Sequence, residues 1–218
     1  MRFIDFLNES NRKLKQLRRL SLTESDYTVQ PKIKRELIQI IRDYCKENGW
    51  NSDLNFINTS LITDMSFLFC GETKYGYGLG RFNGDISKWD VSNVKTMTGM
   101  FYGAEKFNQP LNNWDVSNVR DMSYMFRDSK SFNQPLNKWD VSNVENMVNM
   151  FSAAKNFNQP LNNWDISNVN YMGYMFDDAK NFNQSLDDWD VSNVRNKEGM
   201  FKNSKLEKIG NLPNWYNE

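Results

Sequence analysis

A short motif, Trp-Asp-Val/Ile-Ser-Asn-Val, recurs at a fixed spacing of 25 residues and constrains the fold more than any other feature of this chain. Its five copies begin at Trp89, Trp114, Trp139, Trp164 and Trp189. Two sets of phenylalanines keep the same period: Phe82, Phe107, Phe132, Phe157, Phe182 and Phe101, Phe126, Phe151, Phe176, Phe201. A period kept without insertions indicates coils that stack in register. Binding is then expected on an extended surface and not in a single enclosed cleft.

Within one unit the apolar pattern changes from the spacing of a strand to that of a helix. In the unit 107–131, Leu111, Trp114 and Val116 fit an extended segment with Trp114 pointing inward. From Val119 onward the apolar spacing becomes three and four, which predicts a short helix. The sequence therefore predicts an α/β repeat: a short right-handed leucine-rich-repeat-like solenoid, with one strand and one short helix per coil and an N-terminal helical cap.

The segments around the repeats are less regular, and Lys197 replaces a methionine of the other units, as a last coil facing water would allow. Pro31 and Gly49 stand where the first turn and the end of a helix are expected. The predicted segments are a basic amphipathic leader helix and linker (1–30), a capping helix (31–52), a degenerate first coil with a Gly/Tyr insertion (53–81), five repeats (82–206) and a C-terminal partial coil (207–218).

The composition argues against most kinds of active site. The 218 residues include no histidine, which removes the commonest general base, the usual catalytic triads and most zinc sites. The carboxylates recur identically in every unit, whereas an enzyme site is one asymmetric group of residues in a pocket. We therefore expect no enzymatic activity, no catalytic residues and no cofactor.

Charge and cysteine usage add further bounds. The first 50 residues hold 11 Lys and Arg against 7 Asp and Glu, an excess too small to indicate nucleic acid binding. Cys45 and Cys70 fall in different elements, so we expect small buried side chains and not a disulfide or a metal site. We expect no secretory signal, because polar residues interrupt the apolar ones at the N-terminus, and no run approaches the roughly 18 apolar residues of a membrane span.

A column of aspartates follows the tryptophans: Asp90, Asp115, Asp140, Asp165 and Asp190. Stacked strands would place these charges about 4.8 Å apart, where each adjacent pair repels by roughly 0.9 to 3.5 kcal/mol. A calcium ion held along this face would relieve the repulsion. In the alternative, which we favour because no calcium-loop spacing is present, each Asp accepts backbone N–H bonds in an Asx turn. Asparagine columns at Asn108 and Asn118 are expected to bond to one another and to turn backbone.

Specificity should lie where the units differ from one another. The candidate partner-binding residues are Tyr75, Tyr77, Tyr102, Arg120, Tyr124, Arg127, Tyr171 and Tyr174. Tyrosine and arginine are favoured at protein interfaces, although drift at unconstrained surface positions explains the same variation. The tryptophan column, by contrast, is expected to be structural core.

The unit Phe-Asn-Gln-Pro-Leu-Asn-Asn-Trp-Asp-Val-Ser-Asn-Val, followed by Met-x-x-Met-Phe, resembles the 25-residue leucine-rich-repeat-like units of BspA-type bacterial surface proteins and mycoplasma lipoproteins. The resemblance covers about 53–201. It implies a surface or secreted protein that binds or adheres to another protein, and the charge balance leads us to expect no nucleic acid partner. Because such repeats also occur in phage proteins, the alternative is a structural or assembly protein of a phage or other large particle, docked by its N-terminal helix.

Overall fold

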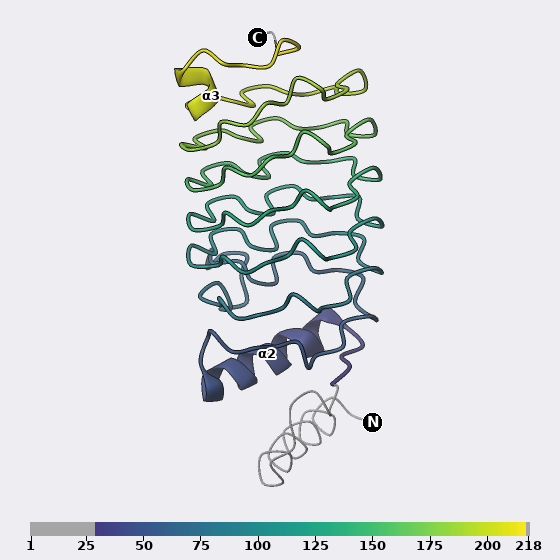
Figure 1. Ribbon diagram of the computed structural model, residues 1–218. Helices are drawn as coiled ribbons and strands as arrows, with labels where there is room; N and C mark the ends of the chain where they lie inside the picture. Colours follow the sequence, from purple (N-terminus) through teal and green to yellow (C-terminus); the bar gives the residue numbers. More distant parts are fainter. Residues whose placement is uncertain (1–28, 217–218) are drawn as a thin grey trace.

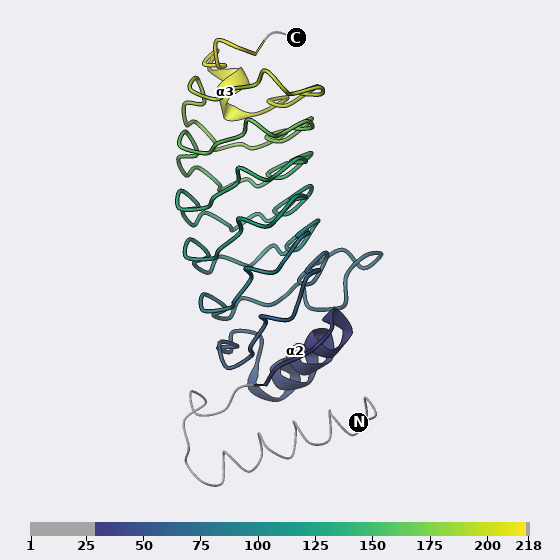
Figure 2. The same cartoon turned by 90° about the vertical axis from the view of Figure 1, so that its right-hand side faces the viewer.

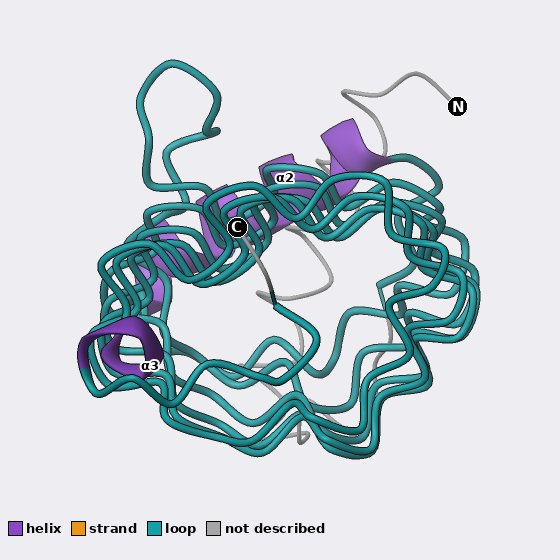
Figure 3. Ribbon diagram, turned by 90° about the horizontal axis from the view of Figure 1, so that it is seen from above, coloured by secondary structure: helices purple, strands orange, loops and turns teal. Residues whose placement is uncertain are grey.

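The computed structural model describes residues 29–216, which form a stack of similar coils between two end segments (Figure 1). Viewed along the stack, the coils superpose in one elongated closed outline (Figure 3). The only helices among these residues are α2 (Lys34–Asn48) and α3 (Lys205–Lys208), and the only β-pairing is isolated bridges. Of the predicted leader helix and linker (1–30), residues 1–28 lie outside the described residues.

Aromatic columns fill the interior of the stack. Phe101 lies 5.4 Å from Phe126 of the next coil, with ring planes 3° apart, and 4.1 Å from Phe107 of the second phenylalanine column. The phenylalanines of both columns are almost fully buried, and every repeat tryptophan is at most 4% exposed. This burial shows that the tryptophans are part of the core, as expected. Because each ring packs on its counterpart one coil away, no coil completes its core alone.

Parallel hydrogen bonds join each coil to the next. One isolated bridge per coil forms a column along the stack, through Asp64, Thr96, Asp121, Asn146, Tyr171 and Asn196. The N–H groups of Met122, Tyr124 and Phe126 all donate to carbonyls one coil further on, at 2.9 Å each. Every second residue of this segment therefore uses its backbone N–H group in a hydrogen bond to the next coil.

The predicted strand and helix of each coil are both wrong. The pairing residue is Asp121, beyond the proposed strand 111–119, and the proposed helix is a series of tight turns. In these turns Met125 N–H donates to Met122 C=O, and Tyr124 has a left-handed backbone with φ 60°. A helix cannot form because its donors are used between coils and its torsions are interrupted. The described fold is thus largely irregular repeating structure around buried aromatic columns.

Side chains supply the inter-coil bonds that strands would otherwise make. The Trp114 indole N–H donates to the Ile86 carbonyl of the preceding coil at 3.1 Å, and the other repeat tryptophans do the same. Asn108 Oδ1 accepts the backbone N–H of Asn133 at 2.9 Å, and the amide of Asn118 donates to the carbonyl of Ser92. The asparagine columns therefore bond to backbone, as expected.

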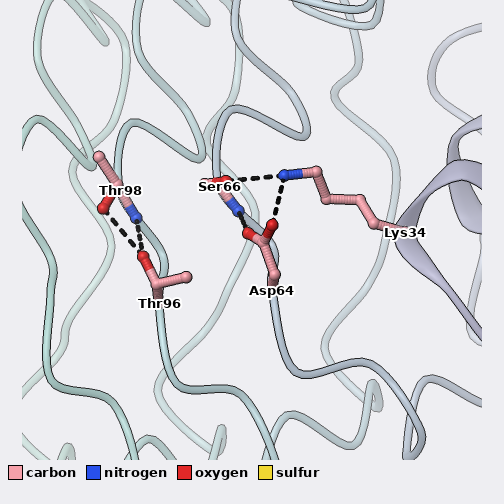
Figure 4. A network of polar contacts seen from close by, with 5 residues as sticks. All are labelled: Lys34, Asp64, Ser66, Thr96 and Thr98. Carbon is pink, nitrogen blue, oxygen red and sulfur yellow. Dashed lines mark hydrogen bonds and ion pairs between the residues drawn. The ribbon is translucent and has the colours of Figure 1, made fainter.

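Both ends of the stack are covered. The apolar face of α2 packs against the first coil, where Tyr44 lies 4.7 Å from Phe56. At the rim of this contact Lys34 bonds to Asp64 and Ser66, while Thr96 and Thr98 bond to each other one coil on (Figure 4).

At the C-terminal end, Trp215 stacks on Trp189 at 6.5 Å and Tyr216 meets Phe201 edge-on. Lys197 does not simply face water as expected, because it is half-buried and its ammonium lies 5.5 Å from the centre of the Tyr216 ring. The lysine is compatible with the last coil because an aromatic ring covers it.

Candidate binding surface

One position in each coil has a left-handed backbone whatever residue occupies it. It holds Phe67, Gly99, Tyr124, Asn149, Tyr174 and Gly199, with φ between 55° and 60°. This is the third position of a type II turn, which Gly and Asn favour. An aromatic side chain here costs roughly 1–2 kcal/mol of backbone strain relative to glycine. Three of the six residues are nevertheless aromatic, so the rings are held at this position against the local backbone preference.

Rings and small residues alternate along this column because the rings lean across the next coil. The Phe67 ring occupies the space that a Cβ on Gly99 would need, and a Cβ on Gly199 would lie 2.5 Å from Cε1 of Tyr174. Phe67 and Tyr174 therefore each require a glycine one coil further on, whereas Tyr124 is followed by Asn149. The result is an aromatic ring at every second coil, about 10 Å apart at the usual spacing of paired chains.

These rings form part of an aromatic strip, which we define as Phe67, Tyr75, Tyr102, Tyr124, Arg127 and Tyr174. Phe67 stacks on Tyr75 with ring centres 5.5 Å apart. The Arg127 guanidinium lies 5.5 Å from the centre of the Tyr102 ring and 5.8 Å from that of Tyr124. Tyr75 is 47% exposed and the other members are half-buried. The strip is therefore a surface of fixed rings with one guanidinium among them.

Hydrogen bonding and burial keep two phenols of the strip protonated. The Tyr174 hydroxyl donates to Glu198 Oε1 at 2.8 Å, and this bond to a carboxylate raises the pKa of the phenol. Burial raises the pKa of Tyr102 as well, although Arg127 opposes that shift. Both phenols are therefore neutral near pH 7, and the single O–H of Tyr174 is already donated to Glu198.

The Gly/Tyr insertion projects from the stack as a loop beside α2 (Figure 2, in blue). Its base is fixed because the backbones of Gly71, Gly80 and Gly103 meet there, and a Cβ on Gly71 or Gly80 would not fit. Arg42 of α2 donates to the Tyr77 carbonyl at 2.8 Å, and the Lys34 ammonium lies 5.7 Å from the centre of the Tyr77 ring. The loop thus presents Tyr75 to the strip and turns Tyr77 toward α2.

A hollow of about 550 Å³ lies where the loop meets the next coils. Its wall carries both signs of charge, including Glu72, Arg81, Lys106 and Asp128, and Lys130 pairs with Glu105 across two coils. Cys70 also lines it, and burial raises the pKa of this thiol. Within residues 29–216 no group of three or more Cys, Asp or Glu side chains is placed to hold a metal ion.

The structure brings together some of the predicted partner-binding residues and separates others. Tyr75, Tyr102, Tyr124, Arg127 and Tyr174 lie in the strip. Arg120 instead pairs with Glu145 at 2.7 Å, and Tyr171, 43% exposed, belongs to the bridge column. Sequence reasoning missed Phe67. Its signal was available, because an aromatic residue and a glycine alternate at one position of successive units.

The aspartate column has a local role in each coil. Asp115 Oδ1 accepts the backbone N–H of Ser117 at 3.1 Å and the Ser117 hydroxyl at 2.6 Å. The equivalent bonds of Asp165 to Ser167 lower the pKa of that carboxyl. This is the geometry of an Asx turn, and at Asp165 it stabilises the charged form of the carboxylate.

Comparison with known proteins gives one family. A family model described as "Mycoplasma protein of unknown function, DUF285" matches residues 39–151 and 111–215, which together run from 39 to 215. No curated protein matches the chain, and no solved structure matches it. The helices at 29–216 include none that is both long and apolar enough to cross a bilayer.

Proposed function

Because the chain belongs to the DUF285 family of mycoplasma proteins, which has no assigned function, we propose from its surface that it is a non-enzymatic module that binds a partner protein along the aromatic strip. The observation that carries this proposal is the set of aromatic residues at left-handed positions. Backbone preference alone would select glycine or asparagine there, and Gly99, Asn149 and Gly199 show that the coil accepts both. The rings of Tyr124 and Tyr174 therefore call for an explanation other than turn formation.

The composition and rigidity of the strip suit a protein interface. Tyrosine and arginine are over-represented among the residues that contribute most to binding. Tyr102, Tyr124 and Arg127 are held by one another and by inter-coil hydrogen bonds, so little side-chain entropy remains to be lost on association. The exposed Tyr75 at one end extends this surface onto the loop.

The finer assignments belong to the same proposal. The Trp-Asp-Val-Ser-Asn-Val units resemble those of BspA-type proteins, which favours a right-handed leucine-rich-repeat-like solenoid and a location at the cell surface or outside the cell, with adhesion as the role. The assembly alternative depends on a docking helix within 1–28, outside the described residues, and stays a prediction.

The test compares proteins that differ only in the strip. Tyr124→Asn and Tyr174→Asn together remove two rings while keeping a residue that suits the left-handed backbone, as Asn149 does in this column. The matched control is Tyr171→Asn, which removes an exposed tyrosine from the bridge column. Proteins retained on each immobilised variant would be quantified, and the leading candidate purified for calorimetry.

We expect a partner whose affinity falls at least tenfold in the double variant and stays within twofold in the control. Loss of the two rings without any change in the affinity of a purified partner would contradict the use of the strip. Equal losses in the double variant and the control would show a nonspecific effect of removing surface tyrosines.

A further inference from the structure

Two columns of opposite charge run along the length of the stack. One is the aspartate column, in which all five carboxylates are exposed. The other lies two residues after a second left-handed position of each coil, which holds Gly103, Asp128, Ala153, Asp178 and Asn203. It consists of Lys130, Lys155, Lys180 and Lys205, while Glu105 takes this place in the first unit. Each column has one member per coil, because its members are 25 residues apart in the sequence.

The spacing of the two columns along the sequence puts them on opposite sides of the coil. From Lys130 the chain runs ten residues to Asp140 and then fifteen to Lys155, which closes one turn of the stack. Figure 3 places α3, which contains Lys205, at one narrow end of the elongated outline. By this count the aspartates belong near the other narrow end. We call the two sides the lysine edge and the aspartate edge.

The residues around each column carry a net charge of the same sign as the column itself. The lysine edge is made of 102–106, 127–131, 152–156, 177–181 and 202–208. The aspartate edge is made of 87–93, 112–118, 137–143, 162–168 and 187–193. The lysine edge holds eight Lys and Arg against five Asp and Glu, whereas the aspartate edge holds seven Asp against two Lys.

Contacts within the molecule neutralise the edges only in part. Lys130 pairs with Glu105 and Lys180 pairs with Asp178, but within residues 29–216 Lys155 has no carboxylate partner. In the aspartate column one carboxylate oxygen bonds to the following serine, as in Asp115 and Asp140. The unpaired charge of each column is repelled by its neighbours one coil away.

We propose that this chain self-associates side by side, with the lysine edge of one copy against the aspartate edge of the next. Because both columns repeat once per coil, the four lysines can meet four successive aspartates, and each contact relieves repulsion within both columns. The equal numbers of acidic and basic residues, 27 each, leave no net charge to keep copies apart.

Such a contact has a defined symmetry. The two surfaces in contact are different, so each dimer keeps one free lysine edge and one free aspartate edge. Assembly then continues beyond a pair, to an open chain of copies or to a ring if the rotation between copies closes. This contact is between copies of the chain and does not depend on the partner proposed above.

The experiment uses two half-blocked variants of the full chain. The first carries Asp115→Asn, Asp140→Asn and Asp165→Asn, which keep the turn because an asparagine oxygen accepts the same N–H. Asn58 already does this with Ser60 at 3.0 Å in the first coil. The second carries Lys155→Gln, Lys180→Gln and Lys205→Gln. A control with Asp43→Asn, Glu47→Gln and Glu145→Gln changes the net charge as the first variant does, away from the aspartate edge.

Sedimentation velocity at about 20 mM and about 500 mM salt reads out the assembly, since salt screens surface charge strongly over this range. The wild type and the control should form species larger than dimers at low salt and become at least tenfold more dissociated at high salt. Each half-blocked variant alone should be monomeric, and their equimolar mixture should form a dimer that grows no further.

Two results would overturn the proposal. Wild-type protein that stays monomeric at low salt would exclude the contact. Wild-type assembly with no dimer in the mixed variants would show that other surfaces associate. Neither result bears on the aromatic strip, because no partner protein is present and no strip residue is substituted.

Discussion

The ring of Tyr174 lies across Gly199 of the next coil, where a Cβ at residue 199 would come within 2.5 Å of Cε1. Gly199 itself has a left-handed backbone with φ 57°. The same relationship joins Phe67 to Gly99, four coils earlier in the column. A glycine in this column therefore serves two purposes, because it relieves backbone strain and makes room for a ring.

Gly199→Ala should destabilise the protein by about 2–4 kcal/mol, the sum of left-handed strain and an overlap with the Tyr174 ring. Gly210→Ala is the matched control, because Gly210 also has positive φ but no atom within 4 Å of its Cβ position. It should cost only the strain, about 1–2 kcal/mol. Urea unfolding of both variants measures the difference. Equal losses would mean that the ring moves aside freely and does not enforce the alternation.

The tryptophan column gives a second prediction. Trp114→Phe removes the bond to the Ile86 carbonyl, although that carbonyl keeps its bond from the Trp89 N–H at 3.1 Å. The loss of one hydrogen bond and the smaller ring together should cost about 2 kcal/mol or more. Trp50→Phe, at a half-buried ring outside the column, should cost clearly less. Circular dichroism gives the urea midpoint of unfolding for each of the two variants. Similar midpoints for both would contradict a stabilising role for the indole hydrogen bond.

The core and the stacking could be predicted from the sequence because they depend on period alone. A ring repeated every 25 residues, such as Phe101 and Phe126, must meet its counterpart if the coils are in register. The secondary structure could not be predicted in the same way. The spacing of Met122, Met125 and Phe126 fits a helix, but consecutive three-residue turns place apolar side chains inward at the same spacing.

The candidate site could be predicted from the sequence only where stacking brings variable positions of adjacent units together. Tyr102, Tyr124 and Arg127 come from nearby positions of adjacent units, so stacking brings them together. Arg120 and Tyr171 also vary between units, but they belong to the bridge segment and lie apart from the strip. Phe67 was missed because the alternation of an aromatic ring with Gly or Asn at its position was not used, and the left-handed torsions behind that alternation are not evident from a phenylalanine alone.

The aspartate turns predict a pH dependence of stability. Bonds from the Ser167 hydroxyl and N–H lower the pKa of Asp165, and the Ser192 N–H lowers that of Asp190. A lowered pKa contributes stability that is complete above the unfolded value of about 3.9 and is lost as the pH falls through the folded value. Asp165→Asn with Asp190→Asn keeps the turns but removes both titrations.

The double variant should therefore lose less stability than the wild type between pH 5 and pH 2. Urea midpoints at several pH values in this range provide the measurement. Asp177 acts in the opposite sense, because burial raises its pKa, but it is present in both proteins and cancels in the comparison. Parallel curves for the two proteins would show that the aspartate turns are not coupled to folding.

The cysteines provide a test of how tightly the first coil is closed. Burial raises the pKa of Cys45 to about 12 and also raises that of Cys70, and both side chains are about 1% exposed. Since the thiolate is the reactive form, neither should react with a disulfide reagent at pH 8 while the protein is folded, and both should react in urea. Cys45→Ser assigns any signal to one residue. Rapid labelling of Cys70 in the folded protein would mean that the loop base opens, because Cys70 lines the hollow beneath it. In that case the glycine contacts at Gly71 and Gly103 would not fix the loop as their close approach implies.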